Sequence, residues 1–257
     1  MDYVITYKCL AHGTAVLNNL KNHERLKKII SDLDSLIKTV DELYLREIRA
    51  AFESLSDAYI TKNMETKGIR LHFAEKNLLK NSNLDKNLII GGYPSTHLMA
   101  LAHYGLSIIC HLRNDDNIAL KHILQTYRYS PKLARTELFP EFYDATGLHN
   151  EVMYKVSLWH TAELDRLNNE SFKGEELIRK GGAFGLAAAA IAITSLFGAP
   201  HLGAAVASKK CMDIYKDSDP STLREKAIRD LEGRIEEKED ELCSAVANEL
   251  LTELGLD

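Results

Sequence analysis

The sequence predicts an all-α fold in which helical hairpins pack against one another. Apolar residues recur at steps of three and four over most of the chain, which is the period of one helical face. Only residues 3–7 (YVITY) have the β-branched and aromatic character typical of a strand. A hydrophobic content of 45%, a charged content of 27% and five prolines indicate a globular chain rather than a disordered one.

Three regions are expected along the 257 residues. Residues 1–23 form an N-terminal segment with one possible short strand. Residues 24–175 form a region of helical hairpins. Residues 176–257 combine a Gly/Ala-rich helical hairpin with a long, acidic C-terminal helix. A chain of this length is long enough for one large domain or for two small ones.

The first helical stretch covers residues 22–63. A second helix runs through residues 69–84 and ends in an Asn/Ser cluster. In the first stretch the apolar residues lie three or four positions apart, so we expect one long helix or two abutting helices. The apolar residues of the first stretch include Leu26, Ile29, Ile30, Leu33, Leu36, Ile37 and Val40. Those of the second helix are Leu71, Ala74, Leu78 and Leu79.

A loop at residues 91–94 (GGYP) separates this helix from the next. Ser95 or Thr96 can then accept the first free backbone N–H groups of the following helix. A polar turn at residues 114–116 (NDD) leads into another helix, which Pro131 terminates. The natural interpretation is a pair of antiparallel helices joined by a short turn.

Two stretches of these helices carry a known repeat pattern. FESLSDAY, residues 52–59, resembles the first helix of a tetratricopeptide repeat, which favours an aromatic residue, then Leu with a small residue, then Tyr. Residues 102–131 resemble a whole repeat. Ala119 stands at the small position of its second helix, Ile123 at the bulky position and Pro131 at the end.

The resemblance covers residues 49–131 in two degenerate copies. It departs from the family pattern at Ser107, where Gly is usual, at Cys110, where Tyr is usual, and in an insertion at residues 81–95. The resemblance implies a concave surface that grips a peptide or a partner helix. We expect four side chains to line this partner-binding surface, namely Tyr93, His97, Tyr104 and Tyr127.

Beyond residue 131 we expect a short helix that stops near Pro140, a turn at Gly147 and a further helix. That helix carries Val152, Val156 and Trp159 on adjoining turns. Trp159 is the only tryptophan of the chain. Packing against neighbouring helices, rather than ligand binding, is the favoured interpretation of this residue.

The C-terminal helix is expected to begin at Asp219 and Pro220, a pair typical of an N-cap and first helical turn. Residues 211–257 hold 14 acidic and 6 basic residues, so the acidic excess of the chain lies here. Two to three heptads favour a packed terminal helix over a coiled-coil dimer. The heptad-like seam consists of Ile228, Leu231, Ile235, Leu242 and Ala245.

Between Arg179 and Lys210 the chain is apolar and rich in Gly and Ala. Pro200 divides this segment into two arms, each short for a membrane crossing. Small residues at every fourth position permit close contact between two helices. Three interpretations stay open: a hairpin buried in the fold, a hairpin that inserts into a membrane on a trigger, and a constitutive anchor. They depend on Gly181, Gly185, Ile191, Ile193, Phe197 and Gly203.

The placement of charged residues and cysteines disfavours several classes of function. The net charge is -5 and Lys and Arg form no dense stripe, which disfavours nucleic-acid binding. Asp2 stands where a secretory signal would be cationic, so we expect a cytoplasmic protein, with membrane association through residues 181–208 as the alternative. The four cysteines lie far apart, without a C-x-x-C pair, and are interpreted as reduced thiols.

Two His–Glu pairs are weak metal-ligand candidates, His72 with Glu75 and His160 with Glu163. Di-iron helical proteins place Glu before His and add two further carboxylates, so we expect no metal and no cofactor. The sequence favours a non-enzymatic component that binds a protein partner or assembles with itself. The alternatives are a membrane-active helical effector using residues 181–208 and a metal-dependent helical enzyme.

Overall fold

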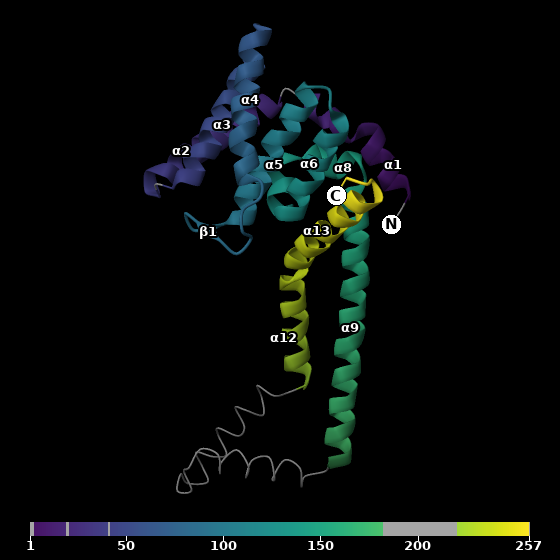
Figure 1. Ribbon diagram of the computed structural model, residues 1–257. Helices are drawn as coiled ribbons and strands as arrows, with labels where there is room; N and C mark the ends of the chain where they lie inside the picture. Colours follow the sequence, from purple (N-terminus) through teal and green to yellow (C-terminus); the bar gives the residue numbers. More distant parts are fainter. Residues whose placement is uncertain (1–2, 19–20, 41, 182–219, 257) are drawn as a thin grey trace, which may run out of the picture. The chain divides into compact units, whose positions relative to one another are not determined.

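The computed structural model describes residues 3–18, 21–40, 42–181 and 220–256 and has the expected all-α, repeat-like architecture (Figure 1). The chain divides into two compact units. The first unit holds Met1–Tyr154 and Glu239–Asp257, and the second holds Lys155–Lys238. These units do not have the bounds of the three regions predicted from the sequence, and that three-region division stays a prediction.

Helices account for nearly all of the described residues, and the strands are two residues long. The elements of residues 3–145 are α1 (Tyr3–His12), the 3-10 helix η1 (Gly13–Asn18), α2 (Lys21–Thr39), α3 (Leu43–Ile60), α4 (Met64–Asn81), β1 (Ile89–Ile90), β2 (Tyr93–Pro94), α5 (Ser95–Leu112), α6 (Asp116–Tyr129), α7 (Pro131–Leu133), the π-helical turn η2 (Ala134–Leu138) and α8 (Pro140–Ala145). The later elements are α9 (Leu148–Gly181), α12 (Pro220–Gly233) and α13 (Ile235–Glu253).

The predicted N-terminal strand is wrong, because residues 3–7 lie in α1. Ile5 and Cys9 are both buried and are four residues apart, so they share one face of a helix. Local strand propensity depends strongly on context, and here the burial of this helical face outweighs it.

The chain between residues 43 and 129 folds as two antiparallel helical hairpins, α3 with α4 and α5 with α6. The predicted turn at residues 114–116 is confirmed. Asp115 caps α6 by accepting a hydrogen bond from the backbone N–H of Ile118, at 3.3 Å. Asn63 caps α4 in the same way through Thr66, at 3.0 Å. Each cap satisfies one N–H group that a helix start leaves unpaired.

The predicted loop at residues 91–94 is confirmed and forms a tight hairpin turn. β1 and β2 pair antiparallel, and Gly91 and Gly92 between them have φ values of 61° and 84°. Glycine reaches these positive φ values without a steric penalty, which suits a two-residue hairpin loop. Ser95 does not cap α5 as predicted, because its hydroxyl donates to the carbonyl of Asp85 at 2.5 Å.

Helix α5 lies at the centre of the core of the first unit. Most of its side chains are buried, and it packs against α3, α4 and α6. At Gly105 the helices approach so closely that an added Cβ would lie 2.6 Å from Cδ1 of Leu78 on α4. A glycine at this point allows the two helices to pack in contact.

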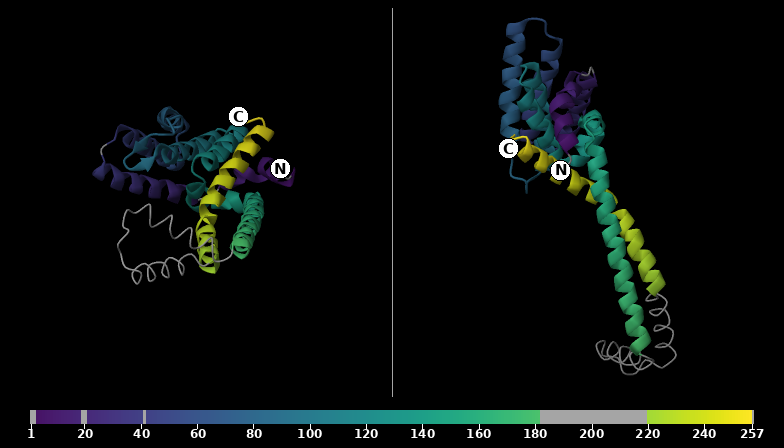
Figure 2. Two further views of the ribbon diagram at one scale, coloured as in Figure 1. Left: turned by 90° about the horizontal axis from the view of Figure 1, so that it is seen from below. Right: turned by 90° about the vertical axis from the view of Figure 1, so that its right-hand side faces the viewer.

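In the second unit, α12 runs alongside the distal part of α9, as both Figure 1 and the right-hand view of Figure 2 show. The indole ring of Trp159 lies 5.8 Å from Arg234 and 5.8 Å from Lys238, measured to the ring centroid. Cations at this distance are attracted to the ring face. Trp159 therefore contacts charged side chains of its neighbours rather than a purely apolar core.

The predicted C-terminal helix is present but is divided into α12 and α13 at Arg234, directly after Gly233. The predicted seam is also displaced. Leu231 of that seam is buried, but Leu242 and Ala245 are only partly buried. The fully buried side chains of α13 instead follow steps of three and four and are Cys243, Val246, Ala247, Leu250 and Leu251.

Candidate functional site

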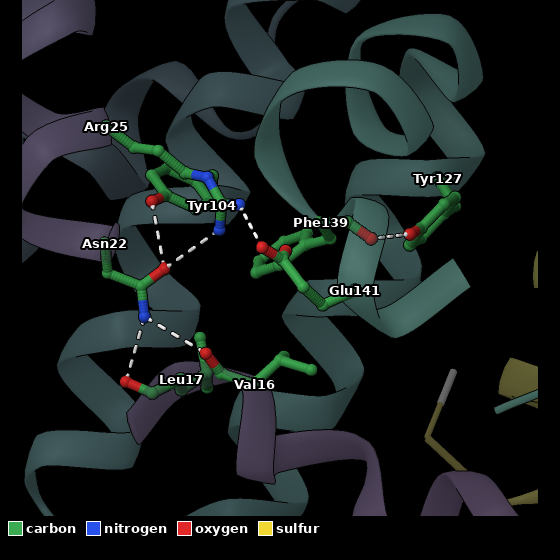
Figure 3. Close-up of polar contacts among 8 residues, drawn as sticks. All are labelled: Val16, Leu17, Asn22, Arg25, Tyr104, Tyr127, Phe139 and Glu141. Atoms are coloured by element: carbon green, nitrogen blue, oxygen red, sulfur yellow. Dashed lines mark hydrogen bonds and ion pairs between the residues drawn. The ribbon is translucent and has the colours of Figure 1, made fainter. Parts of the chain in front are cut away.

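Two of the four predicted partner-binding residues, Tyr104 and Tyr127, are core residues (Figure 3). Their side chains have no exposed surface. The hydroxyl of Tyr104 donates to Oδ1 of Asn22 at 3.5 Å, and that of Tyr127 donates to the carbonyl of Phe139 at 2.5 Å. Burial raises the pKa of both phenols. Their assignment to a partner-binding surface is wrong, because no partner can reach them.

The polar cluster around Tyr104 joins elements that are distant in the chain (Figure 3). Asn22 is fully buried, and its amide donates to the carbonyls of Leu17 at 2.9 Å and Val16 at 3.3 Å. Buried carbonyls without a donor would destabilise the fold, so Asn22 secures η1 against α2. The role of this cluster is structural.

An ion pair extends the same cluster to α8. Arg25 donates to Glu141 at 2.5 Å, and both side chains are partly buried. Burial alone would raise the pKa of Glu141, but the hydrogen bond from Arg25 lowers it below its ordinary value. The carboxylate thus stays ionised in the fold and pairs with the guanidinium.

The other two predicted residues, Tyr93 and His97, lie at the surface beside the β1–β2 hairpin. Tyr93 is 45% exposed, and its ring centroid lies 5.9 Å from that of His97. Burial lowers the pKa of His97, which therefore stays neutral near pH 7. Leu88 and Ile89 are exposed on the same hairpin. A partner contact through Tyr93 and His97 stays a prediction.

A surface crevice between α3 and α4 was not predicted from the sequence. Its volume is about 450 Å³, and its lining includes Ile69 and Phe73, which are 65% and 48% exposed. These residues are one helical turn apart on α4 and therefore neighbours. Ser54, Thr66 and Arg70 complete the lining, and Arg70 forms an ion pair with Asp57 on α3. We refer to Ile69, Arg70 and Phe73 as the α4 surface.

The sequence did contain a signal for the α4 surface. Leu71, Ala74 and Leu78 form the buried stripe of α4, as the helical period predicts. Ile69 and Phe73 fall outside this stripe, so α4 is apolar on two faces. An amphipathic helix with a second apolar face has residues that its own core does not use, and this makes the α4 surface a candidate interaction surface.

Two histidines bridge α5 and α6, of which His103 is buried and His122 is half-buried. Nδ1 of His103 lies 2.9 Å from Nδ1 of His122, and the His103 ring stacks on Tyr129. Burial lowers the pKa of His103 to about 3 and that of His122 to about 4. Both rings are therefore neutral near pH 7, so that one nitrogen donates and the other accepts.

The thiols are poorly suited to nucleophilic chemistry. Cys9, Cys110 and Cys243 are free, whereas Cys211 lies outside the described residues. Burial raises the pKa of Cys9 and Cys243 to about 12 and that of Cys110 to about 11. Because the thiolate is the reactive form, these three cysteines are unreactive near neutral pH.

The weak metal-ligand candidates fall in different units. His72 and Glu75 belong to the first unit, where Arg113 donates to both carboxylate oxygens of Glu75, at 2.6 and 2.9 Å. His160 and Glu163 belong to the second unit, and Glu163 pairs with Arg166 at 2.9 Å. Among the residues that the structure describes, no group of three or more His, Cys, Asp or Glu side chains is placed to hold a metal ion.

The predicted core or membrane hairpin falls outside the described part of the chain, except for Gly181, the last residue of α9. Nothing in the structure tests the roles proposed for Gly185, Ile191, Ile193, Phe197 and Gly203, which stay predictions. Within the described ranges, none of the helices has the combination of length and apolar character that a membrane crossing requires.

Comparison with known families identifies the type of repeat. The family described as "E3 ubiquitin-protein ligase LIN-like, ARM repeat" matches residues 5–180, which is more than half of the chain. The helical-repeat class predicted from the sequence is thereby confirmed. The repeat that the comparison names is ARM, and the resemblance to tetratricopeptide repeats is not confirmed.

Curated relatives come from legumes and are much longer proteins. Two proteins of Lotus japonicus, named as candidate E3 ubiquitin-protein ligases LIN-1 and LIN-2, are each 32% identical over 139 residues, covering 54% of this chain and 9% of the relative. The corresponding LIN protein of Medicago truncatula is 28% identical over 159 residues, covering 55% of this chain and 11% of the relative. This chain thus spans about a tenth of their length. No solved structure matches it significantly.

Proposed function

Because the chain belongs to the family of LIN-like E3 ubiquitin-protein ligase ARM repeats, we propose that it is a protein-interaction module that binds a protein partner through its helical hairpins. The observation that carries this proposal is the α4 surface, where Ile69 and Phe73 remain exposed beside a crevice. Stacked helical repeats present extended surfaces of this kind to their ligands.

The α4 surface has the composition that is typical of the centre of a small protein–protein interface, with apolar side chains in the middle and polar groups around them. Ile69 and Phe73 supply apolar area, and aromatic side chains are frequent energetic anchors in interfaces. Ion pairs between α3 and α4, Arg70 with Asp57 and Lys80 with Glu47, give the hairpin a polar margin. The partner that fits is a protein segment that inserts an apolar side chain into the crevice and places polar groups against these ion pairs.

The names of the relatives suggest the context in which such a partner acts. The Lotus and Medicago proteins are named as candidate E3 ubiquitin-protein ligases, and this chain spans about a tenth of their length. We extend the proposal accordingly: the chain acts as the partner-binding repeat of a ubiquitin-ligase assembly, and the captured protein is a component or a substrate of that assembly.

Affinity capture from cells that produce the protein tests this proposal. The full chain serves as bait beside the double variant Ile69→Asp/Phe73→Asp. The matched control is Leu79→Asp, which places the same charge at a 53%-exposed apolar position of α4 outside the crevice lining. Circular dichroism establishes that all baits are folded.

The proposal predicts proteins that both the wild type and Leu79→Asp retain, and that the double variant loses. Retention by all three baits would exclude the α4 surface as the binding site. Ubiquitin-modified forms or ubiquitin-pathway enzymes among the lost proteins would support the ligase context, and their absence would restrict the proposal to a simple interaction module.

A further inference from the structure

The C-terminal part of α13, residues 239–253, belongs to the first unit and packs there against helices that lie far earlier in the chain. It lies across α8 in Figure 1, and its buried stripe follows helical spacing. Its polar contacts include four residues from other elements, Thr6, Arg128, Arg135 and Tyr143. We call the surface formed by these four residues the α13 seat.

At one end of the α13 seat, Arg135 of η2 receives two carboxylates. Its guanidinium lies 3.2 Å from Glu239 and 3.2 Å from Asp240, and the Arg135 side chain is only 14% exposed. The hydroxyl of Tyr143 also donates to Glu239, at 3.2 Å. Charge-assisted hydrogen bonds to a shielded guanidinium are directional, so this end fixes the direction and register of the bound helix.

Two hydroxyl groups fix the remainder of the helix. Ser244 donates to the backbone carbonyl of Arg128 at 2.8 Å. That carbonyl lies in the last turn of α6, where carbonyl groups have no intrahelical donor. At the far end, Thr6 of α1 donates to Glu253 at 2.9 Å. The seat therefore recognises acidic and hydroxyl groups at defined positions along one amphipathic helix.

The origin of α13 sets it apart from the helices on which it packs. It reaches the seat only through Lys155–Lys238, which form the second unit. The match to the ARM-repeat family ends at residue 180, so α13 lies outside the matched part of the chain. Helix α13 binds through an acidic pair, Glu239 and Asp240, followed by an apolar stripe. Another helix with the same pattern can make the same contacts.

From these contacts we propose that the α13 seat is a helix-binding surface for a partner protein, and that α13 occupies it as an internal competitor. The partner is an amphipathic helix with two adjacent carboxylates followed by apolar residues at positions equivalent to 243, 246, 247, 250 and 251. This seat is distinct from the α4 surface, so either proposal can fail without the other.

A version of the protein that can be cleaved between α12 and α13 tests whether α13 can be exchanged for another helix. A specific protease site is inserted at Arg234, between α12 and α13, so that cleavage breaks the covalent link to α12 and leaves α13 held by non-covalent contacts alone. The proposal predicts that the cleaved fragment co-elutes with the rest of the chain in size-exclusion chromatography. A labelled peptide of residues 236–256, added in excess, then replaces it while circular dichroism shows the remainder folded.

Two further peptides define what the seat recognises. A designed helix that keeps only positions 239, 240, 243, 246, 247, 250 and 251 should compete within about tenfold of the natural peptide. A peptide with Glu239→Lys and Asp240→Lys should compete at least about tenfold less well, because two like charges then face Arg135. The variant Arg135→Glu should reverse this preference.

Four results would overturn the proposal. The fragment could dissociate without any competitor, which would show that the seat has no useful affinity. It could resist exchange, or its loss could unfold the rest of the chain, and either would make α13 an integral core helix. Equal competition by the charge-reversed peptide would show that the acidic pair is not recognised.

Discussion

Helices α4 and α5 have the same length, 18 residues, but they use their apolar side chains in opposite ways. Most side chains of α5 are buried, including Tyr104 and His103. Helix α4 buries only one stripe and leaves Ile69 and Phe73 in solvent. An apolar residue of a central helix therefore stabilises the fold, whereas one on an outer helix that the core does not use is available to a partner.

The largest expected effect of a substitution is in the core around α5 and α6. Tyr127→Ala removes a fully buried ring, and we expect the free energy of unfolding to fall by about 3–5 kcal/mol. Tyr127→Phe loses only the bond to the Phe139 carbonyl and should cost about 1–3 kcal/mol. Tyr93→Ala, at the surface, is the control. Urea denaturation measures all three, and similar losses for Tyr93 and Tyr127 would contradict the comparison.

Acid should destabilise the fold through His103 and His122. Their folded pKa values, about 3 and about 4, lie below the ordinary 6.5, so between pH 6.5 and 4 the unfolded chain binds more protons. Stability is therefore lost as the pH falls through this window, at up to about 1.4 kcal/mol per pH unit for each histidine. It should not depend on these groups above pH 6.5.

Unfolding measured at pH 7, 6, 5 and 4.5 tests this prediction. The variant His122→Asn removes one titrating group and should flatten the dependence of stability on pH. The control is His72→Asn, because the side chain of His72 is 78% exposed. A profile that His122→Asn leaves unchanged would show that this histidine pair does not titrate as described.

Two glycines on neighbouring helices should respond in opposite directions to the same substitution. In Gly105→Ala the new methyl group meets the buried Leu78, and we expect a loss of about 1–3 kcal/mol from overpacking. In Gly68→Ala the methyl group meets nothing within 4 Å, so the gain in helix propensity, about 1 kcal/mol, should dominate. Thermal melts of the two variants give the signs, and stabilisation by Gly105→Ala would disprove the close contact of α4 with α5.

The smallest effect on stability is expected at the α4 surface. Ile69→Ser and Phe73→Ser remove exposed side chains and should each change the free energy of unfolding by no more than about 0.5 kcal/mol. A loss of several kcal/mol in urea denaturation would mean that these side chains support the core, and the contrast between α4 and α5 would fail.

The helical period predicted the helices and their order well, because local spacing determines which residues share a face. Of the four apolar residues predicted for α4, Leu71, Ala74 and Leu78 form its buried stripe, whereas Leu79 is 53% exposed. The strand expected at residues 3–7 was wrong because the burial of Ile5 and Cys9 on one helical face outweighs local propensity.

The site was predicted less well, because burial depends on contacts that are distant in the sequence. Tyr93 lies at the β1–β2 hairpin and is exposed, whereas Tyr104 lies in the middle of α5 and is buried. The ring of Tyr104 packs on Phe52 and Phe139, which are distant from it in the sequence. The buried stripe of α13 was likewise displaced from the predicted seam. Its position is determined by Arg128 and Arg135, more than 100 residues earlier.

Photo-crosslinking at position 73 tests the central claim, that the α4 surface binds a partner, most directly. Phe73 is replaced by a photo-activatable phenylalanine analogue in the full chain, and the same analogue is placed at Leu79 as the reference position. The account predicts a discrete crosslinked adduct from position 73, absent at position 79 and lost when Ile69→Asp is added. Adducts of equal yield from both positions, or none from position 73, would contradict it.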